Sequence, residues 1–304
     1  MKIAITGGAG FIGSHVADAY IAAGHDVVII DNFSSGNLKN VPPQARVVEL
    51  DITSPAIDEL FQVEQFDVLN HHAAQIDVRV SVKSPMFDAT QNIIGGLNLY
   101  ESAVRHGVKK IIFASSGGTV YGDQEQFPAG EDHPTRPCSP YGIAKLSNEH
   151  YLFYYAKQYG VSYVALRYGN VYGPRQNPHG EAGVVAIFVK KMLNGEQPII
   201  NGDGLKTRDY VFVGDVARAN LLALNDSAQG AYNVGTAKET DVTTIFRHLQ
   251  AIINPNCPEI HGDEKPGEQQ RSVISYEQIM RELGWSPEVE FMQGLEKTVA
   301  YFRG

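Results

Sequence analysis

The hydrophobic positions of the first 170 residues form short continuous runs, separated by longer segments with helical spacing. Six runs are expected to be strands: Lys2–Thr6, Asp26–Asp31, Ala45–Asp51, Phe66–Ala73, Lys109–Ser115 and Ser162–Tyr168. Runs that are apolar without alternation are typical of parallel strands covered on both faces. Between the runs, helices are expected at Gly10–Gly24, Met86–His106 and Pro140–Tyr159. This alternation predicts an α/β fold with a doubly wound parallel sheet.

The pattern changes after residue 169, where loops lengthen and prolines and glycines cluster. Five further helices are expected: Gly183–Leu193, Asp215–Leu224, Thr243–Ile253, Ser275–Leu283 and Met292–Phe302. We therefore predict two domains, residues 1–169 with the sheet and residues 170–304 as a smaller irregular unit over its carboxyl edge. Strands from about residues 205–240 are expected to join the first domain.

Composition and charge exclude several classes of protein. The 304 residues carry a net charge of -9, which argues against binding to nucleic acid or to an anionic membrane. No apolar run reaches the length of about 18 residues that a membrane span needs, and no signal peptide opens the chain, so a cytoplasmic location is expected. With only two cysteines, the chain cannot build a disulfide scaffold. The histidines do not stand at the spacing from carboxylates that is typical of metal ligands, so no metal is expected.

A glycine-rich segment joins the first expected strand to the first expected helix. Gly7, Gly10 and Gly13 give the spacing G-x-x-G-x-x-G, which allows a tight turn and lets a pyrophosphate approach the N-terminus of the helix. Asp31, about 20 residues on, is placed to accept both ribose hydroxyls of a dinucleotide. The segment DNFSSG, which begins with Asp31, contains no Arg or Lys, so the 2′-phosphate of NADP would lie beside a carboxylate with no cation to pair with it. The first domain is therefore expected to be a Rossmann domain that binds NAD rather than NADP, with adenine near Asp51.

Tyr141 and Lys145 stand four residues apart and so share one face of the expected helix. Tyrosine has an ordinary pKa near 10 and is a poor base at pH 7. A lysine ammonium and a nicotinamide cation beside it both favour the phenolate, and a shift of about 3 units takes roughly 4 kcal/mol. The pair therefore predicts general-base chemistry, with further hydroxyls offered by ASSGGTVYG after the fifth strand.

Seven motifs together resemble those of the extended short-chain dehydrogenases/reductases: TGGAGFIG, DNFSSG, HHAAQIDVRVSV, FASSGGTVYG, SPYGIAK, LRYGNVYGPRQ and DGLKTRDYVFVGD. Within that group the chain is similar to the nucleotide-sugar 4-epimerases, above all those of UDP-glucose and UDP-galactose. The resemblance extends through KPGEQQRS to ELGWSP, over essentially the whole chain. It implies NAD that stays bound, a UDP-sugar substrate and a homodimer.

The resemblance also implies roles for individual residues. Tyr141 removes the proton of the sugar 4-hydroxyl, Lys145 assists it, and the 4-keto sugar turns over before the hydride returns to its other face. Cofactor contacts are implied for Gly7, Gly10, Phe11, Ile12, Gly13, Asp31, Asn32, Ser35, Gly36, Asp51, Ile52, Ala73, Ala74, Gln75 and Gln91, besides the catalytic pair. Substrate contacts are implied for Ser116, Asn170, Val184, Val185, Ile200, Asn201, Arg208 and Lys265.

Three positions depart from the family pattern. Gly117 stands where many members have Ser or Thr, so Ser116 or Thr119 supplies that hydroxyl or none does; we take Ser116 as the catalytic hydroxyl. Lys265 stands where arginine is expected, and it offers a phosphate a point charge without the bidentate fork. Ser272 stands where a bulky tyrosine can exclude N-acetyl sugars, which adds UDP-N-acetyl sugars to the candidate substrates.

Related activities fit the residues less well. The 4,6-dehydratases need an Asp-Glu pair before V-Y-G, where this chain has Gly118 and Thr119, and the decarboxylases usually place Glu there. The sequence does not exclude a UDP-glucuronate 4-epimerase, in which Arg79 or Arg175 would supply the cation that binds the C6 carboxylate of the sugar. A non-catalytic NAD-binding regulator would be expected to lack the tyrosine–lysine pair. The aromatic stripe Tyr151–Tyr155 is expected to be core or a dimer face.

Overall fold

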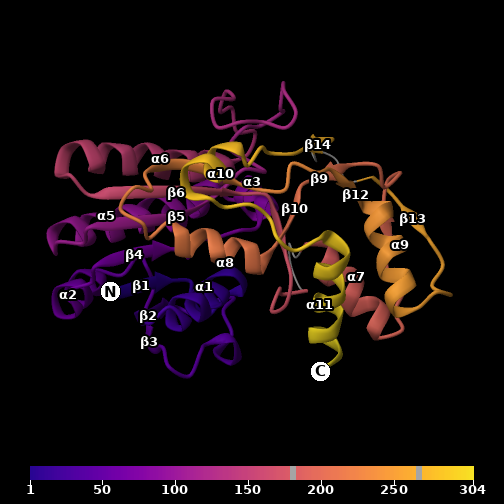
Figure 1. The fold of residues 1–304 in the computed structure, drawn as a ribbon, viewed down its shortest axis with the longest axis horizontal. Coiled ribbons are helices and arrows are strands. Elements are labelled where there is room, and N and C mark those ends of the chain that lie inside the picture. The colour runs from indigo at the N-terminus through magenta and orange to yellow at the C-terminus, as the bar shows by residue number, and fades with distance from the viewer. Residues whose placement is uncertain (179–182, 265–268) are drawn as a thin grey trace.

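The computed structural model describes residues 1–178, 183–264 and 269–304. Within these ranges a seven-stranded parallel sheet has the order β11-β6-β5-β4-β1-β2-β3 (Figure 1). Its strands are β1 (Lys2–Thr6), β2 (Asp26–Asp31), β3 (Arg46–Glu49), β4 (Val68–His71), β5 (Lys110–Ser116), β6 (Ser162–Tyr168) and β11 (Gly230–Val234). The predicted doubly wound sheet is confirmed. Its order reverses between β1 and β4, and the crevice at such a switch point is where ligands bind.

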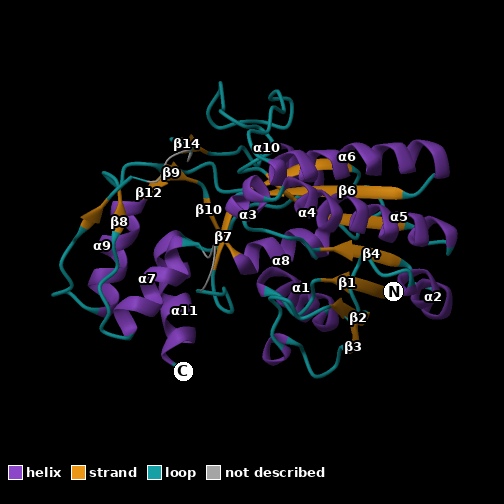
Figure 2. Ribbon diagram, turned by 180° about the vertical axis from the view of Figure 1, so that it is seen from behind, coloured by secondary structure: helices purple, strands orange, loops and turns teal. Residues whose placement is uncertain are grey.

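Helices cover both faces of this sheet (Figure 2). One layer contains α1 (Phe11–Ala22), α8 (Val213–Leu222) and α10 (Glu277–Leu283). The other contains α2 (Ala56–Glu64), α5 (Gly95–Arg105) and α6 (Pro140–Tyr159). The strands supply both cores alternately, since Ile3 and Ile5 pack below the first layer and Ala4 below the second. This two-sided burial explains why the strand sequences are apolar throughout.

The second unit has a core of its own. Its helices α7 (Val184–Leu193), α9 (Val242–Ile253) and α11 (Phe291–Arg303) pack on one another at the right of Figure 1. Short strands complete it: β7 (Asn170–Tyr172), β8 (Ile200–Asn201), β9 (Thr207–Arg208), β10 (Tyr210–Phe212), β12 (Thr240–Asp241), β13 (His261–Gly262) and β14 (Arg271–Ser272). Although β11 comes later in the chain than β7 to β10, it pairs with β6 in the large sheet.

One expected helix differs in detail from its prediction. The segment 86–106 is helical, but it consists of α4 (Pro85–Ala89), a π-helical turn (Thr90–Ile94) and α5. The periodicity of the sequence does not mark this turn, and π turns occur often at functional sites. The pattern also gives no sign of α3 (Val78–Lys83). That short helix starts where the Asp77 side chain accepts backbone hydrogen bonds from Arg79 and Val80.

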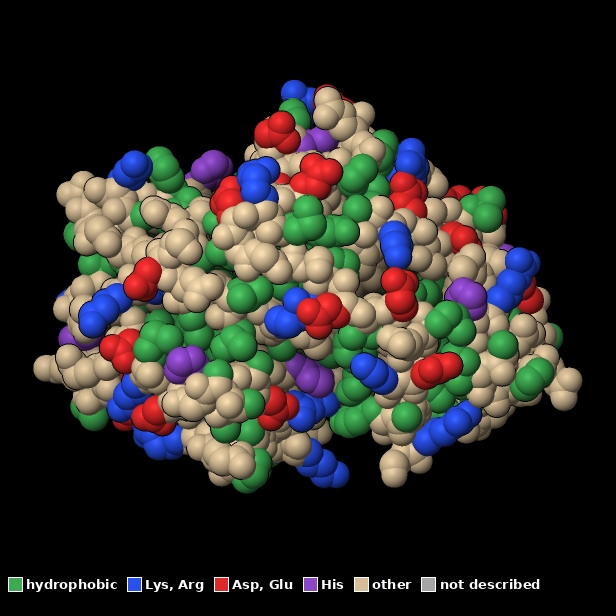
Figure 3. All heavy atoms as spheres, viewed as in Figure 1, with side chains coloured by type: hydrophobic (Ala, Val, Ile, Leu, Met, Phe, Trp, Pro, Cys, Tyr) green, Lys and Arg blue, Asp and Glu red, His purple; other side chains and the backbone are tan. Residues whose placement is uncertain are grey.

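The surface carries charges of both signs. Lys and Arg alternate with Asp and Glu over the face seen in Figure 3, without an extended area of one sign. In the part of the chain that the structure describes, no helix has the length and apolar character needed to cross a membrane.

Candidate active site

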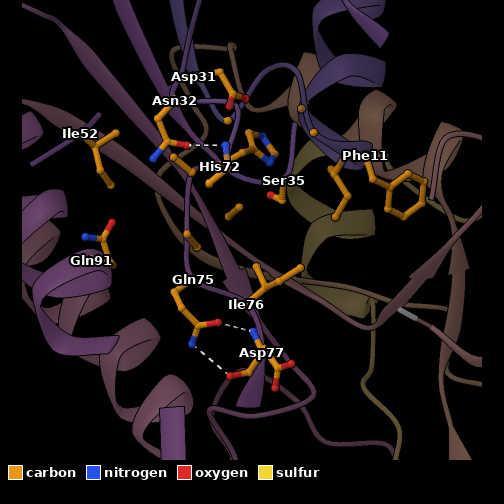
Figure 4. Close-up of a pocket in the computed structure, with 18 of the residues that line it drawn as sticks. Phe11, Asp31, Asn32, Ser35, Ile52, His72, Gln75, Ile76, Asp77 and Gln91 are labelled. Carbon is orange, nitrogen blue, oxygen red and sulfur yellow. Dashed lines mark hydrogen bonds between the residues drawn. The ribbon is translucent and has the colours of Figure 1, made fainter. Parts of the chain in front are cut away.

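A cavity of about 670 Å³ lies at the carboxyl edge of the sheet, at the switch point between β1 and β4. Small-molecule sites have volumes of about 300–1,000 Å³. Figure 4 shows Asp31 and Asn32 at one end, Gln75 at the other, and Phe11 opposite Gln91. The structure places these predicted residues in its lining: Gly7, Gly10, Phe11, Ile12, Gly13, Asp31, Asn32, Ser35, Asp51, Ile52, Ala73, Ala74, Gln75, Gln91, Tyr141 and Lys145. Gly36 lines a second, adjoining cavity instead.

The glycine-rich loop forms a cradle suited to a pyrophosphate. Gly7 has a φ of +68°, and an added Cβ there would lie 2.6 Å from the backbone nitrogen of Ala73. At Gly13 an added Cβ would collide with the backbone oxygen of Gly7. Gly10 is the N-cap of α1 and supplies no side-chain cap, so the N–H groups of the first turn are left for a ligand. The loop therefore fits an anionic dinucleotide through both its shape and its free donors.

Asp31 has a structural task as well as its predicted ligand task. Its Oδ2 accepts a hydrogen bond from Ala9 N at 3.0 Å, and its Oδ1 accepts one from Phe33 N at 2.9 Å. The carboxylate thus ties the end of β2 to the glycine loop. Each carboxylate oxygen has a second lone pair, so ribose hydroxyls can still donate to it. At the same end, Asn32 Nδ2 donates to Asp51 Oδ2 at 2.7 Å and joins the ends of β2 and β3.

Tyr141 and Lys145 lie on the first turns of α6 and both line the cavity. The helix starts well because Ser139 caps it by accepting a hydrogen bond from Gly142 N. Lys145 is buried, and its Nζ donates to the backbone oxygen of Ala114 at 2.8 Å and lies 5.5 Å from the centre of the Tyr141 ring. Burial lowers the pKa of Lys145 to about 8. The ammonium form therefore still dominates at pH 7, beside the phenol that it is expected to activate.

A buried ion pair supports this helix from behind. Glu149 lies one turn after Lys145, and its Oε2 pairs with Arg167 Nη2 at 2.6 Å. Ser115, which lines the cavity, donates from Oγ to Glu149 Oε1 at 2.5 Å. Tyr121 accepts a further hydrogen bond from Arg167 Nη1 at 2.9 Å. The ends of β5 and β6 are thus fixed to the helix that carries Tyr141.

Residues 3–235 match the model of the NAD dependent epimerase/dehydratase family. The chain belongs to this family. It is 44% identical over 301 residues to a Methanocaldococcus jannaschii protein named putative UDP-glucose 4-epimerase, with 99% of this chain and 98% of the relative covered. The predicted resemblance and the predicted cofactor, NAD, are confirmed.

Solved structures of the family agree with the fold over its full length. A UDP-glucose 4-epimerase of Thermotoga maritima, solved with UDP-glucose, superposes with a TM-score of 0.98 at 45% identity and covers 100% of this chain and 99% of its own. A UDP-glucose 4-epimerase of Thermus thermophilus, solved in complex with NAD, gives 0.94 at 42% identity and the same coverage.

Gly117, which stands where the family usually has a hydroxyl residue, lies close to the side chain of Ile274. An added Cβ at Gly117 would lie 2.7 Å from Ile274 Cδ1 and 3.2 Å from the backbone oxygen of Arg167, so a serine there does not fit without movement of Ile274. Ser116 and Asn170 flank Gly118, since an added Cβ there would lie 3.9 Å from Ser116 Oγ and 3.6 Å from Asn170 Oδ1. Neither Ser116 nor Asn170 is among the residues that line the two described cavities, whereas Ser115 lines the cavity that contains Tyr141, so the catalytic role expected of the Ser116 hydroxyl stays a prediction.

The other expected substrate residues are more scattered. Val185 and Ile200 have no exposed surface and pack in the core of the second unit, so their side chains are closed to a ligand, and the expectation that these residues flank the nucleotide base stays a prediction. Their sequence neighbours are more accessible: Val184 is half-buried and Asn201 is exposed. Arg208, on β9, is half-buried. Lys265 lies outside the described residues. Ser272, opposite Arg208 in the parallel β9–β14 pair, is buried and lines neither cavity in the described part of the chain.

Two further aromatic side chains belong to the cavity wall: His72, for which its place at a strand end predicts packing beside the cofactor, and Tyr168, which the sequence did not single out. His72 and Tyr168, at the ends of β4 and β6, line the cavity with their rings stacked at 6.2 Å. Burial, reinforced by the nearby Lys145 ammonium, lowers the pKa of His72 to about 3, so the ring is neutral at pH 7. Their positions at strand ends beside the switch point are the signal that identifies them. Among the described residues, no group of His, Cys, Asp and Glu is arranged to hold a metal ion.

Proposed function

We propose that the protein interconverts UDP-glucose and UDP-galactose by oxidation and re-reduction at C4 of the sugar. The observation that carries the proposal is the Tyr141–Lys145 pair in the wall of a cavity whose glycine cradle fits NAD. A Mycolicibacterium smegmatis protein that is 41% identical over 310 residues is named UDP-glucose 4-epimerase, and the Methanocaldococcus jannaschii relative at 44% is named putative UDP-glucose 4-epimerase. These names support the choice of sugar.

In the proposed mechanism, Tyr141 Oη takes the proton of the 4-hydroxyl and later returns it. NAD, which the glycine loop and Asp31 would hold, would supply the acceptor and then the donor for the C4 hydride. The Lys145 ammonium stabilises the phenolate, and its bond to Ala114 O keeps it beside Tyr141. Neutral His72 adds no competing positive charge to this wall. Gly118 and Thr119 offer no acid–base pair for elimination of water, so the 4-keto sugar is re-reduced rather than dehydrated.

Proton NMR of the purified protein with UDP-galactose, without added NAD, tests the proposal. We expect the signals of UDP-glucose to appear, because the retained cofactor is regenerated in each cycle. Parallel samples contain UDP-N-acetylgalactosamine and UDP-glucuronate. No reaction in the UDP-galactose sample, even after NAD is supplied, would refute the activity.

The two additional samples separate the alternative substrates. Reaction with the N-acetyl sugar would show that the site accepts the acetamido group, the outcome predicted from serine rather than a bulky tyrosine at position 272. Reaction with UDP-glucuronate alone would favour the uronate epimerase. The cations considered for its carboxylate are engaged elsewhere, since Arg175 Nη1 lies 2.7 Å from Asp18 Oδ2 and Arg79 pairs with Asp77 at 3.4 Å. Neither arginine lines the cavity that contains Tyr141.

We infer that the protein is a homodimer joined through α6. Ile143, Tyr151 and Tyr154 are exposed and share one face of this helix. Met86, 84% exposed on neighbouring α4, and Ile94, on the π turn, extend the apolar surface. Contiguous exposed apolar surface of this kind marks an interaction site. Light scattering tests the assembly, because a dimer has twice the chain mass of 33.3 kDa and a monomer does not.

A further inference from the structure

A second cavity of about 460 Å³ adjoins the first and has no role in the chemistry described above. Four residues line both cavities and so separate them: Phe11, Ser35, Gln176 and Asn177. In Figure 4, Phe11 and Ser35 lie on the side of the first cavity opposite Gln91. The second cavity therefore adjoins the part of the first cavity that is formed by the glycine loop and by Asp31, where the ribose of a dinucleotide is expected.

The charge and shape of the second cavity suit the anionic part of a dinucleotide. Arg175 and Lys190 supply cationic side chains to its lining, and Tyr301 and Phe302 supply aromatic rings from the end of α11. Asn37 and Asn40 add amide groups from the loop after β2. A diphosphate and an adenine have the complementary charge and surface.

Two contacts hold the second unit against α1 beside this cavity. Arg175 Nη1 lies 2.7 Å from Asp18 Oδ2, and the His15 ring nitrogen Nε2 lies within 3.0 Å of the backbone oxygen of Pro174. Arg175 has a φ of +66°, a left-handed conformation that is uncommon for a residue other than glycine. Such a conformation persists only where the surrounding structure holds it. The contacts hold Pro174 and Arg175, which directly precede Gln176 and Asn177 in the wall between the cavities.

We propose that the second cavity is the route by which NAD enters and leaves, and that the Asp18–Arg175 and His15–Pro174 contacts slow its release. The cations attract the diphosphate on the way in. The contacts to α1 keep the separating wall in place once the cofactor is seated. The inference rests on the proposed function only for the identity of the cofactor, because release is measured without turnover.

Two substitutions separate the contact from the charge. Asp18→Asn breaks the ion pair but leaves the Arg175 cation at the cavity, so NAD should leave about threefold faster and bind to the NAD-free protein at least as fast as before. Arg175→Asn tolerates the left-handed backbone and removes both the ion pair and the cation. It should therefore speed release and also slow binding at low salt. Combining Asp18→Asn with His15→Phe, which keeps a ring beside Phe11, should raise the release rate about tenfold.

Asp58→Asn is the matched control, because it breaks an ion pair with Arg105 (2.6 Å) that lies on α2 and α5, away from both cavities. Holoenzyme is diluted into alcohol dehydrogenase and ethanol, and the NADH formed from released NAD is followed by absorbance. Thermal unfolding checks that each variant is folded. Release from Asp18→Asn and from the double variant at the wild-type rate, or equal acceleration in Asp58→Asn, would overturn the proposal. An inactive protein that still shows the predicted release rates would refute the epimerase activity alone.

Discussion

Replacement of Tyr141 by phenylalanine is expected to lower the turnover of UDP-galactose about 1,000-fold while the protein stays folded and keeps its NAD. The substitution removes one oxygen and leaves the ring that Lys145 Nζ approaches to 5.5 Å. Positioned general acid–base groups contribute about 10²–10⁴-fold to rate. The epimerase rate is measured by NMR or a coupled assay, and bound NAD is measured by its release after denaturation.

The matched control for this experiment is Tyr151→Phe, which removes the hydroxyl of an exposed tyrosine on the same helix. This control should keep nearly the full rate. Activity of Tyr141→Phe close to that of the wild type would remove Tyr141 from the role of base, even if the fold and the cofactor were unchanged. Loss of NAD together with the rate would instead show that Tyr141 acts mainly in binding.

The sheet and its helices could be predicted closely because their signals are local. The bounds of β1, β2, β6 and α6 agree with the prediction, since continuous apolar runs and a Ser-Pro helix start mark them directly. The cofactor end of the site was predictable for the same reason. A parallel sheet brings the ends of its strands to one edge, so residues far apart in sequence, such as Asp31 and Gln75, line one cavity.

The substrate side could not be predicted as well because its geometry depends on contacts between distant segments. Gly117 illustrates this: its sequence context suggests a missing hydroxyl, whereas the structure shows that a Cβ there would lie only 2.7 Å from Ile274 Cδ1. Ile274 is held in turn by Asp209, whose carboxylate accepts from Ile274 N and from Thr236 N. The same limit applies to Val185, whose burial is decided by packing between α7 and α9 rather than by its own spacing.

Replacement of Lys145 by methionine is expected to reduce the epimerase rate at least about 100-fold and, unusually for a buried position, to stabilise the NAD-free protein. The rate falls because the phenolate of Tyr141 loses its ammonium partner. Stability rises because burial lowers the pKa of Lys145 to about 8 from an ordinary 10.5. At pH 7 that difference costs about 3 kcal/mol. The lost hydrogen bond to Ala114 O offsets about 1 kcal/mol of the gain.

The pH dependence distinguishes this origin from simple repacking. Below pH 8 both the folded and the unfolded wild type hold the lysine proton, so the burial cost is constant. Between about pH 8 and pH 10.5 only the unfolded chain keeps it, so the unfolded state binds more protons and wild-type stability rises with pH. The advantage of Lys145→Met should therefore fall from about 2 kcal/mol at pH 7 to near zero at about pH 9.5 in urea unfolding. An advantage that does not change with pH would show that Lys145 is not buried as a charged group.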